Sequence, residues 1–125
     1  MKETDADLFD MCEEQVRGMY VELSTLSKKK PDGPVNKFKL KYVNDLLKKA
    51  DSLLGERYCP LDGFHGFDAD ELPTASDVVF VLSQYLKNMD KFRHDHTFMS
   101  GGDCVWRLDD GKTKETRRSA LSMRP

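Results

Sequence analysis

Apolar residues recur at steps of three and four near the start of the chain, and this period predicts an amphipathic helix over residues 5–27. Thr4 and Asp7 have the spacing of a capping box at its beginning. Residues 31–34, Pro-Asp-Gly-Pro, end the helix and turn the chain. The predicted apolar face consists of Leu8, Phe9, Cys12, Val16, Met19, Tyr20, Leu23 and Leu26.

The same period predicts a second helix over residues 35–54. Pro34 suits its first turn, and Gly55 suits a left-handed C-cap. The connection that follows, residues 56–73, shows no period, and its apolar side chains are expected to pin it to the core. The apolar stripe of this helix contains Phe38, Tyr42, Val43, Leu46, Leu47, Ala50, Leu53 and Leu54.

A third helix is predicted over residues 75–93, opened by a capping box between Thr74 and Asp77. The run from Val78 to Leu82 is apolar all the way round, which is also typical of a strand, but the helical period continues beyond it and favours a helix. Such a turn lies either at the centre of a bundle or in an interface.

Past His96 the pattern changes to the alternation of a strand around Cys104, Trp106 and Leu108. Asp110-Gly111 is typical of a two-residue hairpin turn, with residues 112–116 as the return strand. The predicted fold is therefore mainly α, with a three-helix bundle core and a small C-terminal β-hairpin. Residues 1–116 are expected to form one helical domain, and residues 117–125 a mobile basic tail.

Composition and charge exclude some classes of protein. The net charge of −2 argues against a dedicated nucleic-acid coat protein. The chain has three cysteines, an odd and widely spaced set that does not suggest a disulfide framework. The sequence shows no secretory signal, and its longest apolar run is too short for a membrane helix. We therefore expect a cytoplasmic protein with no membrane partner.

Several metal-ligating residue types occur in or near predicted loops. Their spacings match no known zinc pattern, so buried thiols and solvated histidines are the simpler interpretation. The acidic residues of the long connection lack the register of a helix-loop-helix calcium site. We expect no bound metal and no cofactor. The residues concerned are Cys59, His65, His94, His96 and Cys104 for zinc, and Asp62, Asp68, Asp70 and Glu71 for calcium.

Enzymatic chemistry has one candidate cluster, formed by Arg93, His94 and His96. Histidine transfers protons near neutral pH and arginine stabilises phosphoryl transition states, so a small hydrolase or nuclease is a third hypothesis. The alternative is a polar helix end whose cations face the helix carbonyls. No phosphate-binding glycine loop, nucleophile elbow or His-Glu-x-x-His helix supports the enzymatic hypothesis.

Basic residues on the second helix and in the tail provide a second hypothesis, a nucleic-acid-associated accessory protein. Tyr42 and Trp106 offer rings on which bases could stack. The alternative is a solvated helix face and a tail that keeps the protein soluble. The basic residues proposed to contact nucleic acid are Lys37, Lys41, Lys48, Arg117 and Arg118.

The leading hypothesis is a non-catalytic protein–protein interaction or regulatory module. The third helix has more apolar residues than one bundle stripe needs, so either the long connection or another chain must cover the excess. We predict a homo-oligomer or an obligate partner, with Phe80 and Val81 near the centre of the interface, and we assign Phe64 and Phe67 to the interaction surface as well.

Overall fold

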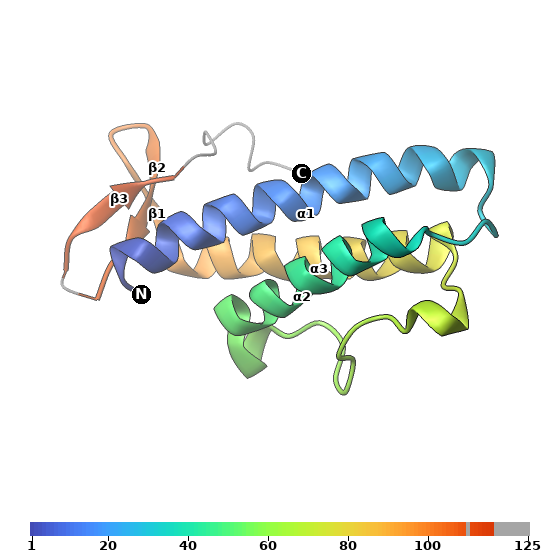
Figure 1. Cartoon of the computed structure of the whole chain (residues 1–125). Helices are drawn as coiled ribbons and strands as arrows, with labels where there is room; N and C mark the ends of the chain where they lie inside the picture. The colour runs from blue at the N-terminus through green and yellow to red at the C-terminus, as the bar shows by residue number, and fades with distance from the viewer. Residues whose placement is uncertain (110, 117–125) are drawn as a thin grey trace.

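A computed structural model describes residues 1–109 and 111–116 of the chain, and it is mainly helical (Figure 1). Three long helices are followed by a small antiparallel sheet, which confirms the predicted fold class. Asp110 and the predicted tail, residues 117–125, lie outside the described residues. The elements are α1 (Glu3–Lys29), α2 (Lys37–Tyr58), η1 (Ala69–Glu71), α3 (Ala75–His96), β1 (Thr97–Ser100), β2 (Asp103–Arg107) and β3 (Thr113–Glu115).

The helix starts agree with the predictions at α3 and differ at α1. At α3, the backbone N–H of Asp77 donates to Thr74 Oγ1 at 3.1 Å, and the Thr74 N–H donates to Asp77 Oδ2 at 3.2 Å. The capping box predicted at Thr4 is wrong, because α1 already begins at Glu3. There the backbone N–H of Lys2 donates to Asp5 Oδ2 at 3.1 Å, so a carboxylate stabilises the helix start two residues earlier than predicted.

The start of α2 also lies later than predicted. Asn36 caps it by accepting the Lys39 N–H at 2.8 Å. Pro34 is not in the first turn but in an antiparallel bridge with Thr74. This bridge ties the connection before α2 to the start of α3.

Gly55 interrupts α2 where the sequence predicts the helix to end, but with φ 71° and ψ 178° it does not have the ψ of the predicted left-handed C-cap. One further turn follows it and ends at Tyr58. The backbone at Gly55 lies in a region that residues with a side chain rarely adopt. The non-helical conformation of Gly55 changes the direction of the chain before it enters the long connection.

Replacement of Gly55 by alanine is expected to lower the free energy of unfolding by roughly 1–3 kcal/mol. No atom lies within 4 Å of the added Cβ, so the loss would be conformational and not steric. Gly18→Ala is the matched control, because Gly18 lies inside α1 with equally open surroundings. It should stabilise the protein by roughly 0.5–1 kcal/mol. Urea unfolding measures the free energy of unfolding of both variants. Equal changes in the two variants would contradict the positive φ angle of Gly55.

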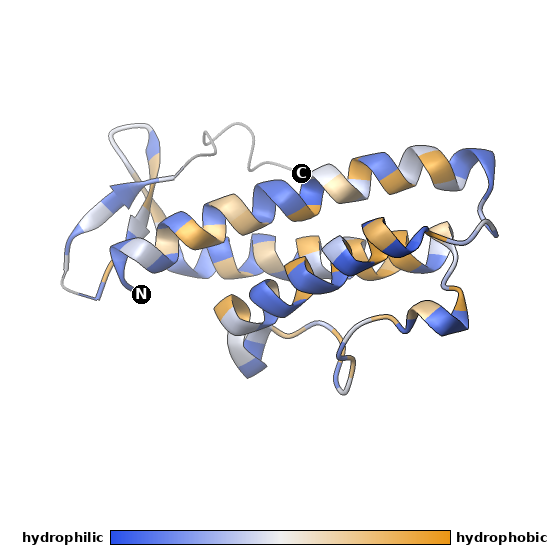
Figure 2. Ribbon diagram, in the orientation of Figure 1, coloured by the Kyte–Doolittle hydropathy of each residue, from blue (hydrophilic) through white to orange (hydrophobic). Residues whose placement is uncertain are grey.

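The core lies between the three helices, and apolar positions on each helix alternate with hydrophilic ones (Figure 2). The run from Val78 to Leu82 is helical, which confirms that prediction. Leu61, Phe64 and Phe67 of the long connection pack against this core as expected. Residues from all three helices are fully or almost fully buried, including Phe9, Val16, Leu23, Leu40, Val43, Leu47, Val78, Leu82, Tyr85 and Met89.

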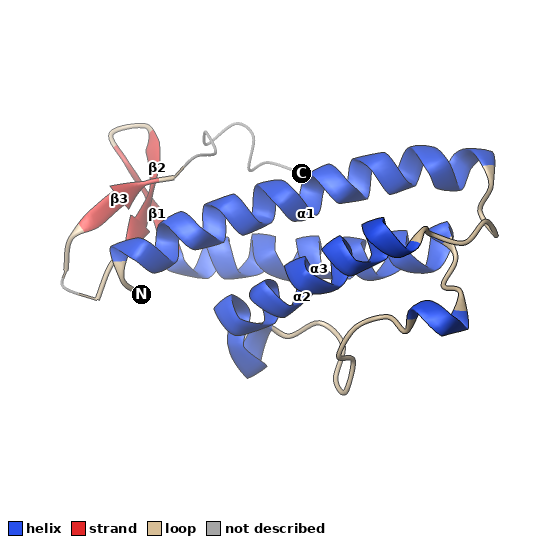
Figure 3. Cartoon of the chain, viewed as in Figure 1, coloured by secondary structure: helices blue, strands red, loops and turns tan. Residues whose placement is uncertain are grey.

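The sheet has the strand order β1-β2-β3 and is antiparallel throughout (Figure 3). The pairing of β2 with β3 confirms the predicted hairpin. Its register is not that of the predicted two-residue turn, because Arg107 pairs with Thr113 and the Leu108 N–H donates to the Lys112 carbonyl at 3.0 Å. The sequence prediction missed β1, which pairs with β2 from Thr97↔Trp106 to Ser100↔Asp103. Gly101 and Gly102 join these strands with φ angles of 59° and 87°, the two positive values of a type I′ turn.

An ion cluster lies inside the core where the sheet meets the helices. Arg93 of α3 is 1% exposed, and its Nη2 lies 2.5 Å from Asp10 Oδ1 and 3.4 Å from Glu13 Oε1 of α1. Trp106 of β2 donates its indole N–H to Asp10 Oδ2 at 3.2 Å. The Arg93 guanidinium also lies over the rings of Trp106 and Phe9, at 4.8 Å and 5.5 Å from their centroids. The cluster therefore joins α1, α3 and the sheet.

Candidate functional site

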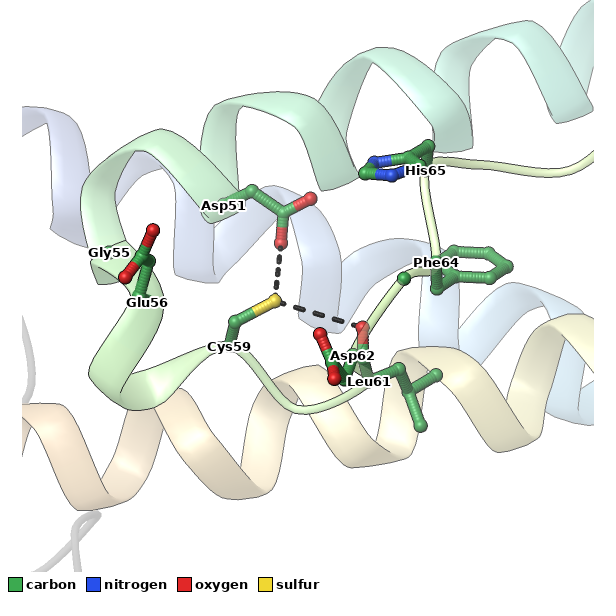
Figure 4. Close-up of a pocket in the computed structure, with 9 residues that line it drawn as sticks. Asp51, Gly55, Glu56, Cys59, Leu61, Asp62, Phe64 and His65 are labelled. Carbon is green, nitrogen blue, oxygen red and sulfur yellow. Dashed lines mark hydrogen bonds between the residues drawn. The ribbon is translucent and has the colours of Figure 1, made fainter.

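A pocket lies where the end of α2 meets the long connection (Figure 4). Its volume is about 620 Å³. Two asparagines hold the connection in place: Asn44 Nδ2 donates to the Phe67 carbonyl at 2.9 Å, and Asn88 Nδ2 donates to the Tyr58 carbonyl at 2.9 Å. The lining residues are Asp51, Gly55, Glu56, Cys59, Leu61, Asp62, Gly63, Phe64 and His65.

Asp51 is the hydrogen-bond acceptor for two side chains at this pocket. Its Oδ1 accepts the Tyr85 hydroxyl of α3 at 2.7 Å and the Cys59 thiol at 3.6 Å. Cys59 Sγ also lies 3.8 Å from the Leu61 carbonyl (Figure 4). Sequence reasoning did not single out Asp51 or Tyr85, because their pairing joins α2 to α3 across 34 residues.

The environment of Cys59 disfavours nucleophilic chemistry. Burial raises the pKa of the Cys59 thiol, and the nearby negative charge of Asp51 raises it further. Burial and the hydrogen bond to Asp51 likewise raise the pKa of Tyr85. Since the thiolate is the nucleophilic form of cysteine, a raised pKa leaves less of it at neutral pH and lowers the reactivity of Cys59. Within the described part of the chain, the hydrogen-bond acceptors of this thiol are Asp51 and the Leu61 carbonyl, and neither is an imidazole.

The five metal-ligand candidates do not meet at one point. Cys59 and His65 line the same pocket, whereas His96 stacks on Phe92 with ring centroids 4.0 Å apart. His94 is exposed on α3, and Cys104 is buried in β2. Among residues 1–109 and 111–116, no group of three His, Cys, Asp or Glu side chains is arranged to hold a metal ion.

The acidic residues of the connection are also dispersed. Asp62 lines the pocket, while Asp68 accepts the Asp70 N–H at 2.9 Å and caps η1. Asp70 and Glu71 belong to η1 itself. These acidic side chains therefore cap a surface turn or extend from it into solvent.

The structure does not bring Arg93, His94 and His96 together as one site. Arg93 is enclosed by the ion cluster of the core. His94 is exposed, and His96 Nδ1 lies 2.8 Å from the Phe92 carbonyl. Arg93 therefore acts as a core cation. The spacing of Leu86, Met89 and Arg93 along α3 was a signal of this burial, because it continues the apolar period.

The four predicted interaction residues occupy different environments. Phe80 is 57% exposed on α3, whereas Val81 is buried in the core of the chain. Phe64 and Phe67 contact each other edge to face, with centroids 5.1 Å apart, and pack partly against the core. The long connection thus covers part of the core, and Phe80 remains accessible to solvent.

A smaller cavity, a groove of about 280 Å³, lies between α1 and α2. Leu8 and Met11 of α1 are 53% and 43% exposed at this groove, although Leu8 belonged to the predicted apolar stripe. Sequence reasoning did not single out Met11. The groove is lined by Leu8, Met11, Cys12, Gln15, Lys49, Ser52 and Leu53.

Lys37, Lys41 and Lys48 lie exposed on one side of α2. Phe38 beside them is 85% exposed, so its predicted place in the apolar stripe is wrong. Tyr42 is also exposed. Arg117 and Arg118, which were grouped with these lysines, lie outside the described residues.

Comparison with protein-family models, with curated protein sequences and with solved structures found no match for this chain. In the part of the chain that the structure describes, no helix is both long and apolar enough to cross a membrane.

Proposed function

We propose that this protein is a non-catalytic interaction module that binds an amphipathic helix of another protein. The observation that carries the proposal is the groove between α1 and α2, where Leu8 and Met11 leave about half of their surface in water. Large apolar side chains grouped at a concave surface are typical of protein-binding sites. The groove would accept apolar side chains spaced three and four residues apart on the partner helix.

The charge at the groove indicates a feature of the partner. Lys49 lies close enough to Cys12 for its positive charge to lower the pKa of that thiol, against the burial that raises the pKa to about 11. Lys49 forms no ion pair with any described residue. A carboxylate beside the apolar stripe of the partner helix would pair with this ammonium group. We therefore propose a helix that carries Asp or Glu next to its apolar residues.

The chemistry of the larger pocket, at the end of α2, also supports a non-catalytic role. Burial and the nearby Asp51 raise the pKa of its thiol, and the core encloses Arg93, the arginine of the enzymatic hypothesis. The three cysteines are unpaired, which agrees with our proposal of a cytoplasmic location.

Photo-cross-linking from the groove tests this function. A photoreactive amino acid at position 11 should capture a discrete protein in cells, whereas the same group at position 21 should not. Val21 is also exposed on α1, and it does not line the groove. Mass spectrometry should map the cross-link to an amphipathic helix, and a synthetic peptide of that helix should bind the purified chain.

Charge introduced into the groove provides the matched comparison. Met11→Asp should strongly weaken peptide binding, and Val21→Asp, an equal change of charge on the same helix, should leave it unchanged. Each lost apolar contact is worth roughly 1.5–3 kcal/mol when fully buried. Equal capture from positions 11 and 21 would refute the proposal. Capture of only the chain itself would replace it with self-association.

A further inference from the structure

We propose that the exposed face of α2 binds single-stranded nucleic acid, a function beyond the protein binding proposed above. In this arrangement Lys37, Lys41 and Lys48 contact successive phosphates, and the Phe38 ring stacks on a base. The proposal depends on two independent observations: an aligned set of lysines, and an apolar ring beside them that is left almost fully in water.

The three lysines form one stripe along the helix. At 3.6 residues per turn, positions 37, 41 and 48 lie within about 40° of one another around the axis. They span roughly 16 Å along it. None of the three pairs with a carboxylate of the described residues. Lys39 differs, because it lies on another side of α2 and pairs with Glu22 of α1 at 3.0 Å.

Phe38 and Tyr42 form a second stripe next to the lysines. They are four residues apart and therefore neighbours on the helix surface. Phe38 is 85% exposed, and neither ring stacks on another aromatic ring of the described residues. The Phe38 ring thus contributes little to the core. An exposed ring beside aligned cations is the arrangement that binds single strands, because every base offers a face for stacking.

The local charge of this face opposes that of the whole chain. On this face the three lysines of the stripe and one acidic residue, Asp45, give a difference of +2, whereas the whole chain has a net charge of −2. Asp45 is exposed on the same face of α2. It is the one nearby group on this segment that repels phosphate, so its removal should strengthen binding.

A single strand is a better match than other polyanions. A duplex buries the faces of its bases in the stack and would leave the Phe38 ring without a partner. An acidic peptide offers carboxylates to the lysines and no base for the ring. These two ligands and an anionic membrane serve as alternatives in the experiment.

Fluorescence anisotropy of the full chain with a labelled uridine 12-mer and a thymidine 12-mer tests the proposal. Both should bind, and affinity should fall about twenty-fold between 50 and 200 mM salt if three phosphates are contacted. Phe38→Ala should weaken binding roughly ten-fold through the loss of stacking. Asp45→Asn should tighten it. All the substituted residues are exposed, so the variants should keep the unfolding curve of the parent protein.

Matched variants on α3 distinguish this face from general charge effects. Lys41→Glu with Lys48→Glu should abolish binding, whereas Lys87→Glu with Lys91→Glu, an equal change of charge, should weaken it only slightly. Phe80→Ala is the control for Phe38→Ala, since Phe80 is also exposed. Equal losses from the paired variants would overturn the proposal. Equal binding of a duplex, poly-glutamate or phosphatidylserine vesicles would also overturn it.

Discussion

Replacement of Arg93 by alanine is expected to lower the free energy of unfolding by about 3–5 kcal/mol. The guanidinium lies within 3.4 Å of Asp10 and Glu13, and all three side chains are buried. Removal of the cation leaves two carboxylates in the core without it, and a buried charge that loses its partner is far more destabilising than a broken surface pair. Urea unfolding followed by circular dichroism measures the loss.

Arg17→Ala is the control for this variant, since Arg17 and Asp90 form an exposed pair at 3.7 Å. It should cost at most about 1 kcal/mol. Adding Asp10→Asn and Glu13→Gln to the Arg93→Ala variant should recover part of the lost stability, because the amides carry no charge. An Arg93→Ala effect no larger than that of Arg17→Ala would contradict a buried cluster.

Trp106→Ala should be the second strongly destabilising change, with a loss of about 3–5 kcal/mol. The indole is fully buried, meets Phe9 edge to face with centroids 5.2 Å apart, and donates its N–H to Asp10. Alanine would leave a cavity between the sheet and the helices. Chemical unfolding followed by circular dichroism is the measurement, because the variant lacks the only tryptophan.

Two substitutions calibrate the Trp106 result. Trp106→Phe keeps an aromatic ring but removes the N–H donor and part of the indole volume, so it should cost less than the alanine variant. Met99→Ala lies in the same sheet at an exposed position and should change stability by less than about 0.5 kcal/mol. If Trp106→Ala lowered the free energy of unfolding no more than Met99→Ala, the packing of the sheet against the core would be contradicted.

The helices and the hairpin were predictable because local patterns determine them. The Thr74 and Asp77 capping box, the interruption at Gly55 and the strand around Trp106 each depend on neighbours in the sequence. Periodicity also assigned Phe38 to the core, where it does not lie. A helix pattern shows which residues share a face, but it does not show how far the neighbouring helix extends over that face.

The polar parts of the structure were not predictable in this way. Glu13 and Arg93 lie at buried positions that continue the apolar stripes of their helices, but charged residues are usually exposed to solvent. Their pairing spans 80 residues and depends on how α1 packs on α3. The contacts of Asp51 with Tyr85 and Cys59 depend in the same way on three elements meeting. Tertiary packing, and not local preference, determines these sites.

The contacts between α1 and the sheet have a consequence for synthesis. Asp10 receives the Trp106 N–H from 96 residues further along the chain, and Glu3 pairs with Lys114 across 111 residues. At about 5–20 residues per second, the first helix leaves the ribosome several seconds before these partners exist. During that interval α1 carries Asp10 and Glu13 without Arg93. We therefore expect α1 to pack stably against α3 and the sheet only after β2 and β3 have been made. The nascent chain would therefore remain a substrate for chaperones until β2 and β3 have been synthesised and have left the ribosome.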